Sequence, residues 1–124
     1  IYDYIRYTGD TSYITEGGLE VLIGVARFWS QRVNYSNDKK AWVMLGVTGP
    51  NEYENNVNNN WYTSFIARWC LQYALKLEAQ FWNKKSLLSP QEVDLSTKIS
   101  ENIYVSIAWR SFYTNLYCYI SPKV

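Results

Sequence analysis

The sequence contains no histidine, and this absence excludes several kinds of catalysis at once. Without an imidazole the chain can have no Ser–His–Asp or Cys–His machinery of its own, no histidine proton relay and no histidine metal ligand. Its two cysteines, Cys70 and Cys118, cannot supply the four thiolates of a structural zinc site. Acid–base chemistry in this chain must therefore come from Asp, Glu, Tyr or Lys side chains.

Charged residues are few and nearly balanced. The 12 Lys and Arg residues and the 11 Asp and Glu residues give a net charge of +1 at pH 7. No nucleic-acid partner is expected, because nucleic-acid phosphates require a concentrated basic face. No membrane partner is expected, because no apolar run approaches the roughly 20 residues of a membrane-spanning helix. Two widely spaced cysteines favour a reducing compartment, and we therefore expect a cytoplasmic protein.

Hydrophobic periodicity predicts an all-α fold of antiparallel helices joined by loops. Apolar residues recur every three or four positions over 19–33, which is typical of an amphipathic helix. The segment 60–81 is apolar around most of its girth, and a helix of that kind is buried on several sides. Its most regular row has a member at every fourth position: Trp61, Phe65, Trp69, Tyr73, Leu77 and Phe81. A capping box of Ser89 and Glu92 predicts a shorter helix that ends near Tyr104.

The segment between the two long helices is not expected to be helical. An apolar run over 41–45 has strand character, and Gly46, Gly49 and Pro50 end it. Five asparagines then surround Val57, and asparagine favours turns and helix caps because its side chain bonds nearby backbone groups. This composition predicts a polar, ordered loop of a length that often carries function in a compact domain.

Two carboxylates, Glu52 and Glu54, lie in this loop. A rigid loop at the end of a secondary-structure element is a place where catalytic carboxylates are often held. The alternative is a loop carboxylate that only accepts hydrogen bonds from nearby amides. Downstream of them, one of the residues Asn58 to Asn60 is expected to cap the following helix.

The stretch from Val47 to Thr63 reads Val-Thr-Gly-Pro-Asn-Glu-Tyr-Glu-Asn-Asn-Val-Asn-Asn-Asn-Trp-Tyr-Thr. It resembles a motif of the disaccharide phosphorylases related to maltose phosphorylase, glycoside hydrolase family 65. The family pattern is Gly-Pro-Asp/Asn-Glu-Tyr, an Asn-rich stretch and an aromatic helix start. The run over 18–29 is similar to the helix that precedes this loop in the family. The resemblance covers about 1–104, and residues 105–124 depart from the family pattern.

The resemblance implies that residues 1–104 are a fragment of a catalytic (α/α)6 barrel domain and that 105–124 form a divergent tail. It implies inverting phosphorolysis of an α-linked, maltose-type glucose disaccharide to glucose 1-phosphate and glucose, with Glu52 as the general acid. Asn51 and Tyr53 are the substrate-binding candidates. No metal or cofactor is expected; inorganic phosphate is the co-substrate, and the full-length family enzyme is expected to be a homodimer.

A phosphorylase of this kind needs only one carboxylic acid, because phosphate is already an anion and requires no general base. That acid must be protonated when the substrate binds, so the pKa of Glu52 is expected to be raised by a less solvated setting. The family's phosphate site uses a histidine, which this chain lacks, so the isolated chain is expected to be inactive. Two alternatives stay open: a non-catalytic helical remnant, and a glucoamylase-like hydrolase in which Glu54 would have to activate water.

Overall fold

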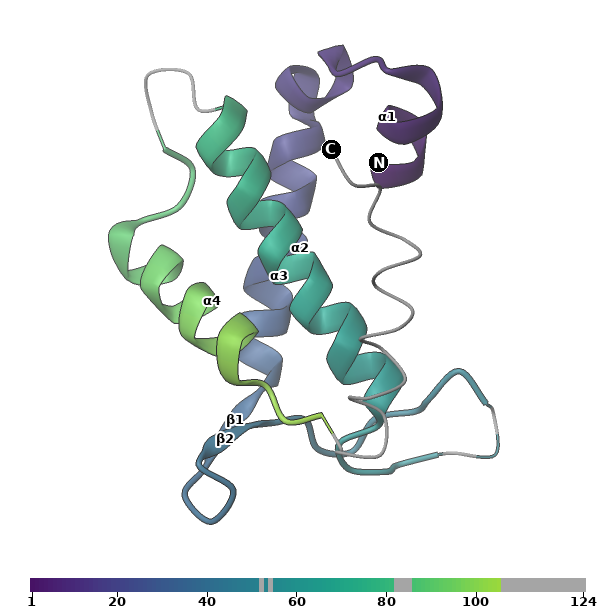
Figure 1. Ribbon diagram of the computed structural model, residues 1–124, viewed down its shortest axis with the longest axis vertical. Helices are drawn as coiled ribbons and strands as arrows, with labels where there is room; N and C mark the ends of the chain where they lie inside the picture. The colour runs from purple at the N-terminus through teal and green to yellow at the C-terminus, as the bar shows by residue number, and fades with distance from the viewer. Residues whose placement is uncertain (52, 54, 82–85, 106–124) are drawn as a thin grey trace. The chain divides into compact units, whose positions relative to one another are not determined.

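The computed structural model of this chain describes residues 1–51, 53, 55–81 and 86–105. Figure 1 shows the elements in chain order, and the described residues are mostly helical, as the sequence predicts. Contacts divide the chain into two compact units. Residues 1–32 and 67–101 form the first unit, and residues 33–66 with the described residues from 102 onward form the second.

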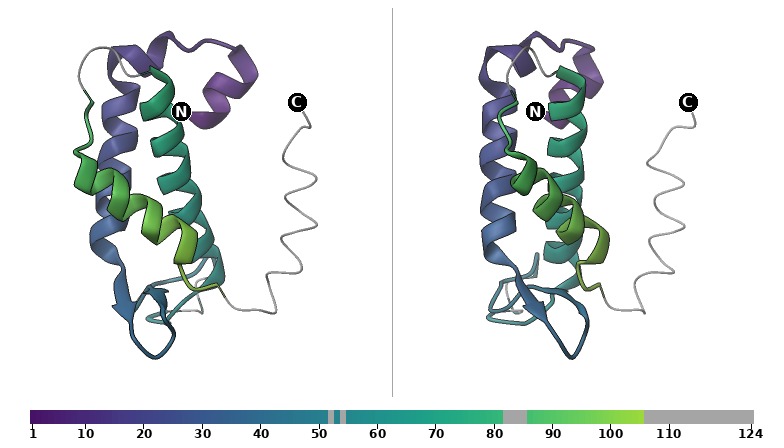
Figure 2. Two further views of the ribbon diagram at one scale, coloured as in Figure 1. Left: turned by 60° about the vertical axis from the view of Figure 1, so that its left-hand side comes forward. Right: turned by 90° about the vertical axis from the view of Figure 1, so that its left-hand side faces the viewer.

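The first unit is a helical layer. Its elements are α1 (Tyr2–Thr8), the kinked helical segment η1 (Ile14–Gly18), α2 (Leu19–Arg32), the greater part of α3 (Trp61–Phe81) and nearly all of α4 (Pro90–Asn102). Within this unit α2 and α3 run side by side, and α4 crosses them obliquely (Figures 1 and 2). The predicted helices over 19–33 and 60–81 are thus confirmed within one residue. No helix in the part of the chain that the structure describes is long and apolar enough to cross a bilayer.

The buried face of α3 is not the aromatic row that its sequence makes conspicuous. The residues less than a tenth exposed follow another row, which shares only Leu77 with the first: Ser64, Ala67, Leu71, Ala74 and Leu77, at spacings of three and four, and Glu78 beside them. Trp69 and Tyr73 are only half-buried; their ring centroids lie 5.1 Å apart in a stacked pair, and the Tyr2 ring lies nearly perpendicular to both. Small side chains allow close approach of neighbouring helices, so close packing favours the row with Ala67 and Ala74 over the bulky row.

A buried carboxylate binds residues 86–88, which precede α4. Glu78 is 6% exposed, and its Oε1 accepts hydrogen bonds from the Ser86 hydroxyl (2.5 Å) and from the amides of Leu87 (2.7 Å) and Leu88 (3.2 Å). The guanidinium of Arg27 donates to the Leu87 carbonyl at 2.8 Å. Side chains of α2 and α3 therefore form hydrogen bonds with the backbone of Leu87 and Leu88, which holds the start of α4 in place.

The predicted capping box at the start of α4 is confirmed and carries an ion pair. The Ser89 amide donates to Glu92 Oε2 at 2.8 Å, and the Glu92 amide donates to Ser89 Oγ at 3.2 Å. Arg27 Nε lies 2.7 Å from Glu92 Oε1. Hydrogen bonds from Arg27, followed by the Ser89 amide, lower the pKa of the Glu92 carboxyl from 4.5 to about 2.

We expect Glu92→Gln to lower the free energy of unfolding of this chain at pH 7, and to matter less in acid. Because the folded-state pKa lies below the unfolded value, the stabilisation is present above about pH 4.5 and is lost as the pH falls towards about 2. Urea unfolding at several pH values measures the difference. Glu101→Gln, an exposed position on the same helix, is the control. A Glu92→Gln deficit that stays constant from pH 7 to pH 2 would contradict the expectation.

The second unit contains two short strands, which depart from the predicted all-α fold class; the sequence indicated strand character only for the second of them. Strands β1 (Asn34–Ser36) and β2 (Ala41–Val43) pair in antiparallel register, with Tyr35 opposite Trp42. The predicted strand character of the apolar run over 41–45 is thus confirmed for its first three residues. The chain after α4 extends the ladder, since the Tyr104 amide donates to the Trp42 carbonyl at 2.7 Å. The residues beyond 105, including most of the predicted tail, lie outside the described residues.

Candidate active site

The predicted catalytic loop connects β2 to α3, over residues 44–60. Both of its ends are buried: Met44 is 0% exposed and Asn60 is 7% exposed. The Asn60 side-chain oxygen accepts hydrogen bonds from the amide and the hydroxyl of Thr63, at 3.1 and 3.2 Å, and so caps α3 as predicted. The loop therefore begins and ends at fixed points of the second unit.

The two arms of the loop run antiparallel and are joined by backbone hydrogen bonds. Val47 and Val57 exchange both of their amide–carbonyl bonds, each 2.9 Å long. Closer to the base, the Asn59 amide donates to the Met44 carbonyl at 2.7 Å. The two arms are consequently bonded to each other from Met44 and Asn59 as far as Val47 and Val57.

Asparagine side chains supply further bonds between the arms. Asn59 Oδ1 accepts the amide hydrogen of Met44 at 3.0 Å, and Asn58 Oδ1 accepts that of Gly46 at 3.0 Å. At the tip, the Thr48 hydroxyl donates to Asn55 Oδ1 at 3.3 Å. These roles were not predicted individually; the cluster of asparagines was the only signal in the sequence.

The arms also need backbone conformations that few residues adopt. Gly46, Asn56 and Asn59 have φ angles of +59°, +54° and +56°. Glycine and asparagine tolerate this left-handed region best. A Cβ on Gly46 would lie 3.1 Å from Asn56 Oδ1, so the space beside this residue is also filled. The residue types at these three positions therefore suit the backbone conformations found there.

The tip carries the residues that the sequence singled out. Asn51 Oδ1 accepts the Tyr53 amide hydrogen at 3.2 Å, and the Tyr53 ring is 96% exposed. Glu52 and Glu54 lie outside the described residues, so the geometry of the predicted acid and the cause of its expected pKa stay predictions. Among the described residues, no group of three or more His, Cys, Asp or Glu side chains is placed to hold a metal ion.

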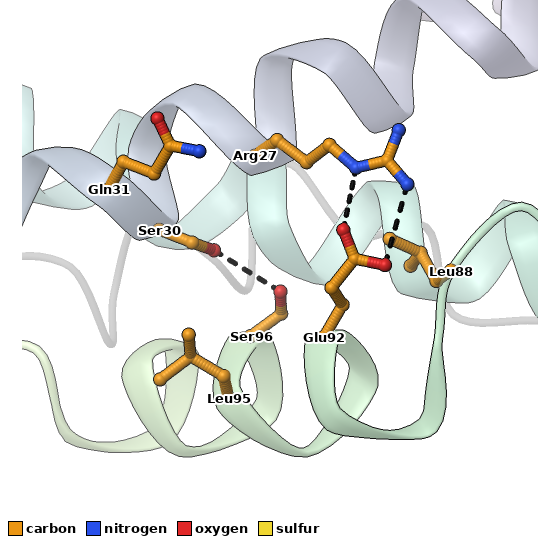
Figure 3. A pocket seen from close by; sticks show the side chains of 7 residues that line it. All are labelled: Arg27, Ser30, Gln31, Leu88, Glu92, Leu95 and Ser96. Atoms are coloured by element: carbon orange, nitrogen blue, oxygen red, sulfur yellow. Dashed lines mark hydrogen bonds and ion pairs between the residues drawn. The ribbon is translucent and has the colours of Figure 1, made fainter.

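A cavity of about 100 Å³ lies in the first unit (Figure 3). It is lined by Arg27, Ser30, Gln31, Leu88, Glu92, Leu95 and Ser96. Its charged groups already neutralise one another in the ion pair described above, and its two serine hydroxyls lie 3.2 Å apart and bond to each other. The polar groups therefore serve the packing of α4 on α2, and the loop over 44–60 is the better candidate.

Comparisons with known proteins agree with the resemblance of the loop. Residues 1–114 match the profile described as "Glycosyl hydrolase family 65 central catalytic domain". Over 107 residues the chain is 51% identical to a maltose phosphorylase of Bacillus subtilis (strain 168), which covers 84% of this chain and 14% of that protein. A protein-glucosylgalactosylhydroxylysine glucosidase of Mus musculus is 39% identical over 75 residues, which covers 60% of this chain and 11% of that protein.

A solved structure gives the same result for the fold. A candidate kojibiose phosphorylase from the human microbiome superposes on this chain with a TM-score of 0.75 and 28% sequence identity. The superposition covers 83% of this chain and 15% of the other. The chain thus spans a small part of the length of each protein that it resembles.

Proposed function

Since this chain belongs to glycosyl hydrolase family 65, we propose that it supplies the acid-bearing loop of a disaccharide phosphorylase. The proposed reaction is inverting phosphorolysis of an α-linked, maltose-type disaccharide to glucose 1-phosphate and glucose. The observation that carries the proposal is the 51% identity to a maltose phosphorylase over 107 residues that include most of this chain. The closed architecture of the loop over 44–60 supports the choice of this segment as the site.

The chemistry assigns one step to this chain. A phosphate oxygen attacks the anomeric carbon from the face opposite the glycosidic bond, and the bond from that carbon to the leaving oxygen breaks. Glu52 gives its proton to that oxygen, so the second glucose leaves as a neutral alcohol. Inversion of an α-linkage makes the product the β-anomer of glucose 1-phosphate. Glu52 is reprotonated from solvent before the next turnover, and no general base is used.

Two neighbours of Glu52 are proposed to contact the sugar. Tyr53 presents an almost fully exposed ring, and aromatic rings provide apolar faces for sugar rings to stack on. The Asn51 side chain uses its oxygen to accept the Tyr53 amide hydrogen, which leaves its NH₂ group to donate to a sugar hydroxyl.

We also propose that residues 1–104 belong to an (α/α)6 barrel. Homodimeric assembly and cytoplasmic location stay predictions from the sequence.

Hydrolysis is the second candidate, because one relative of this chain is a glucosidase. An inverting hydrolase needs a second carboxylate that activates water on the opposite face of the sugar. Glu54 is the nearest carboxylate in sequence, but it is separated from Glu52 by one residue. This short separation does not readily give the two opposed positions that the hydrolytic mechanism requires, so we favour phosphorolysis.

The proposed reaction is tested by an activity assay on the protein encoded by the open reading frame that contains this chain. Incubated with maltose, this protein is expected to release β-glucose 1-phosphate and glucose in equal amounts, and only when inorganic phosphate is present. Release of two glucose molecules without phosphate would establish the hydrolase instead. A folded product with neither activity would favour the non-catalytic remnant. The isolated 124-residue chain is the matched control, and we expect it to be inactive because its phosphate-binding residues would lie elsewhere.

Residue-level tests use a chimera, in which the matching segment of the Bacillus subtilis maltose phosphorylase is replaced by this chain's residues. The 51% identity makes the two segments compatible in packing. The host then supplies the phosphate site, and the chain supplies the acid loop. Variants in the chimera therefore report on the loop alone.

A further inference from the structure

The base of the loop is closed by one asparagine that bonds a single partner residue twice. The Asn59 amide donates to the Met44 carbonyl at 2.7 Å, and Asn59 Oδ1 accepts the Met44 amide hydrogen at 3.0 Å. Met44 is fully buried and directly follows β2. The pair thus joins two points that are fifteen positions apart in sequence and anchors them to the core of the second unit.

The residue type at this position meets two demands at once. The backbone at Asn59 is left-handed, with φ at +56°, which strongly disfavours most residues. Its side chain must also place an acceptor on an amide across the loop. Asparagine and aspartate satisfy both demands, glycine satisfies only the first, and alanine satisfies neither. Asn58 provides a similar bond between the arms, since its Oδ1 accepts the amide hydrogen of Gly46.

We propose that Asn59, supported by Asn58, is a positioning residue for the proton transfer, because it fixes the base of the loop that contains Glu52. This inference rests on the proposed function. The two hydrogen bonds between Asn59 and Met44 set the separation and the direction of the two arms at the base of the loop. A proton donor must lie within hydrogen-bond reach of the leaving oxygen, and a displacement of about 1 Å can cost 10²-fold in rate.

A purely structural role would have a different kinetic signature. Loss of the fold would lower activity on every substrate, whereas misplacement of the acid affects only leaving groups that need a proton. α-Glucosyl fluoride separates these cases, because fluoride leaves as an anion. In its phosphorolysis the bond from carbon to fluorine breaks, a phosphate oxygen bonds to the anomeric carbon, and no proton from Glu52 is consumed.

The experiment compares Asn59→Ala, Asn59→Gly and Asn59→Asp in the chimera, with Asn37→Ala, an exposed asparagine of the β1–β2 turn, as the control. Asn59→Ala and Asn59→Gly are expected to lower kcat on maltose by about 10–100-fold, with KM for maltose nearly unchanged. Activity on α-glucosyl fluoride is expected to stay close to that of the chimera. Asn59→Asp keeps the acceptor and is expected to restore most of kcat.

Three outcomes would overturn the proposal. Equal losses on maltose and α-glucosyl fluoride would assign Asn59 to general stability, as would loss of folding in all three variants by circular dichroism. Unchanged kcat on maltose in Asn59→Gly would show that the acceptor is dispensable. These results are distinct from failure of the proposed function, for which the marker is full activity of Glu52→Gln on maltose in the same chimera.

Discussion

Glu52→Gln in the chimera is expected to lower kcat for maltose phosphorolysis by about 10²–10⁴-fold, the range that a positioned general acid contributes. Glutamine has nearly the size of glutamic acid but has no acidic proton to transfer. The leaving glucose would then depart as an alkoxide, which is the unfavourable step that the acid avoids. Activity on α-glucosyl fluoride is expected to survive, since its leaving group requires no protonation. Initial rates with the two substrates, over a range of pH, measure both effects.

The control for this experiment lies two residues along the same loop. Glu54→Gln removes a carboxyl group of the same type, and it is expected to leave kcat within a few-fold of the chimera. The alkaline limb of the rate profile is expected to disappear in Glu52→Gln and to persist in Glu54→Gln, because that limb reports the ionisation of the acid. A loss in Glu54→Gln as large as that in Glu52→Gln would reject the single-acid mechanism.

Leu71→Ala is expected to destabilise the chain by about 2–5 kcal/mol, which is the range for removing a large aliphatic side chain from a core. Leu71 is 0% exposed and lies at the centre of the buried row of α3. The loss combines the transfer free energy of the removed carbons with the cavity that the surrounding helices cannot fill. Urea unfolding of the 124-residue chain, followed by circular dichroism, measures the free energy of unfolding.

Lys76→Ala is the matched control, because it is exposed on the same helix. It is expected to change the free energy of unfolding by no more than about 0.5 kcal/mol. The comparison also tests the assignment of the buried face. If Trp69→Ala destabilised the chain clearly more than Leu71→Ala, the row of α3 that contains Trp69, and not the row that contains Leu71, would form the core.

Helices α2, α3 and α4 could be predicted from the sequence because their signals are local. The apolar spacing over 19–33, the capping box at Ser89 and an asparagine cap within 58–60 each specify an element without reference to distant residues. The inward face of α3 could not be predicted in the same way. Its apolar residues surround most of the helix, and the choice between Leu71 and Trp69 depends on how closely its neighbours approach.

The loop shows the same division between local and distant information. Its position, its polar character and the candidate acid followed from the residues and the family resemblance. The bonds from Asn58 and Asn59 to the opposite arm did not, since they join residues twelve or more positions apart. Strand β1 was not predicted for a similar reason: three residues, Asn34–Ser36, carry too little pattern of their own and become a strand only by pairing with β2.

The two hydrogen bonds between Asn59 and Met44 also bear on how far the length of the loop can change. Beyond the closed base, a change in loop length costs little, because the entropy of closing a loop grows only with the logarithm of its length. Insertions or exchanges within residues 48–56 therefore need not shift the register of β2 or the first turn of α3. The base of the loop can therefore keep its geometry when the length of the segment between its arms changes.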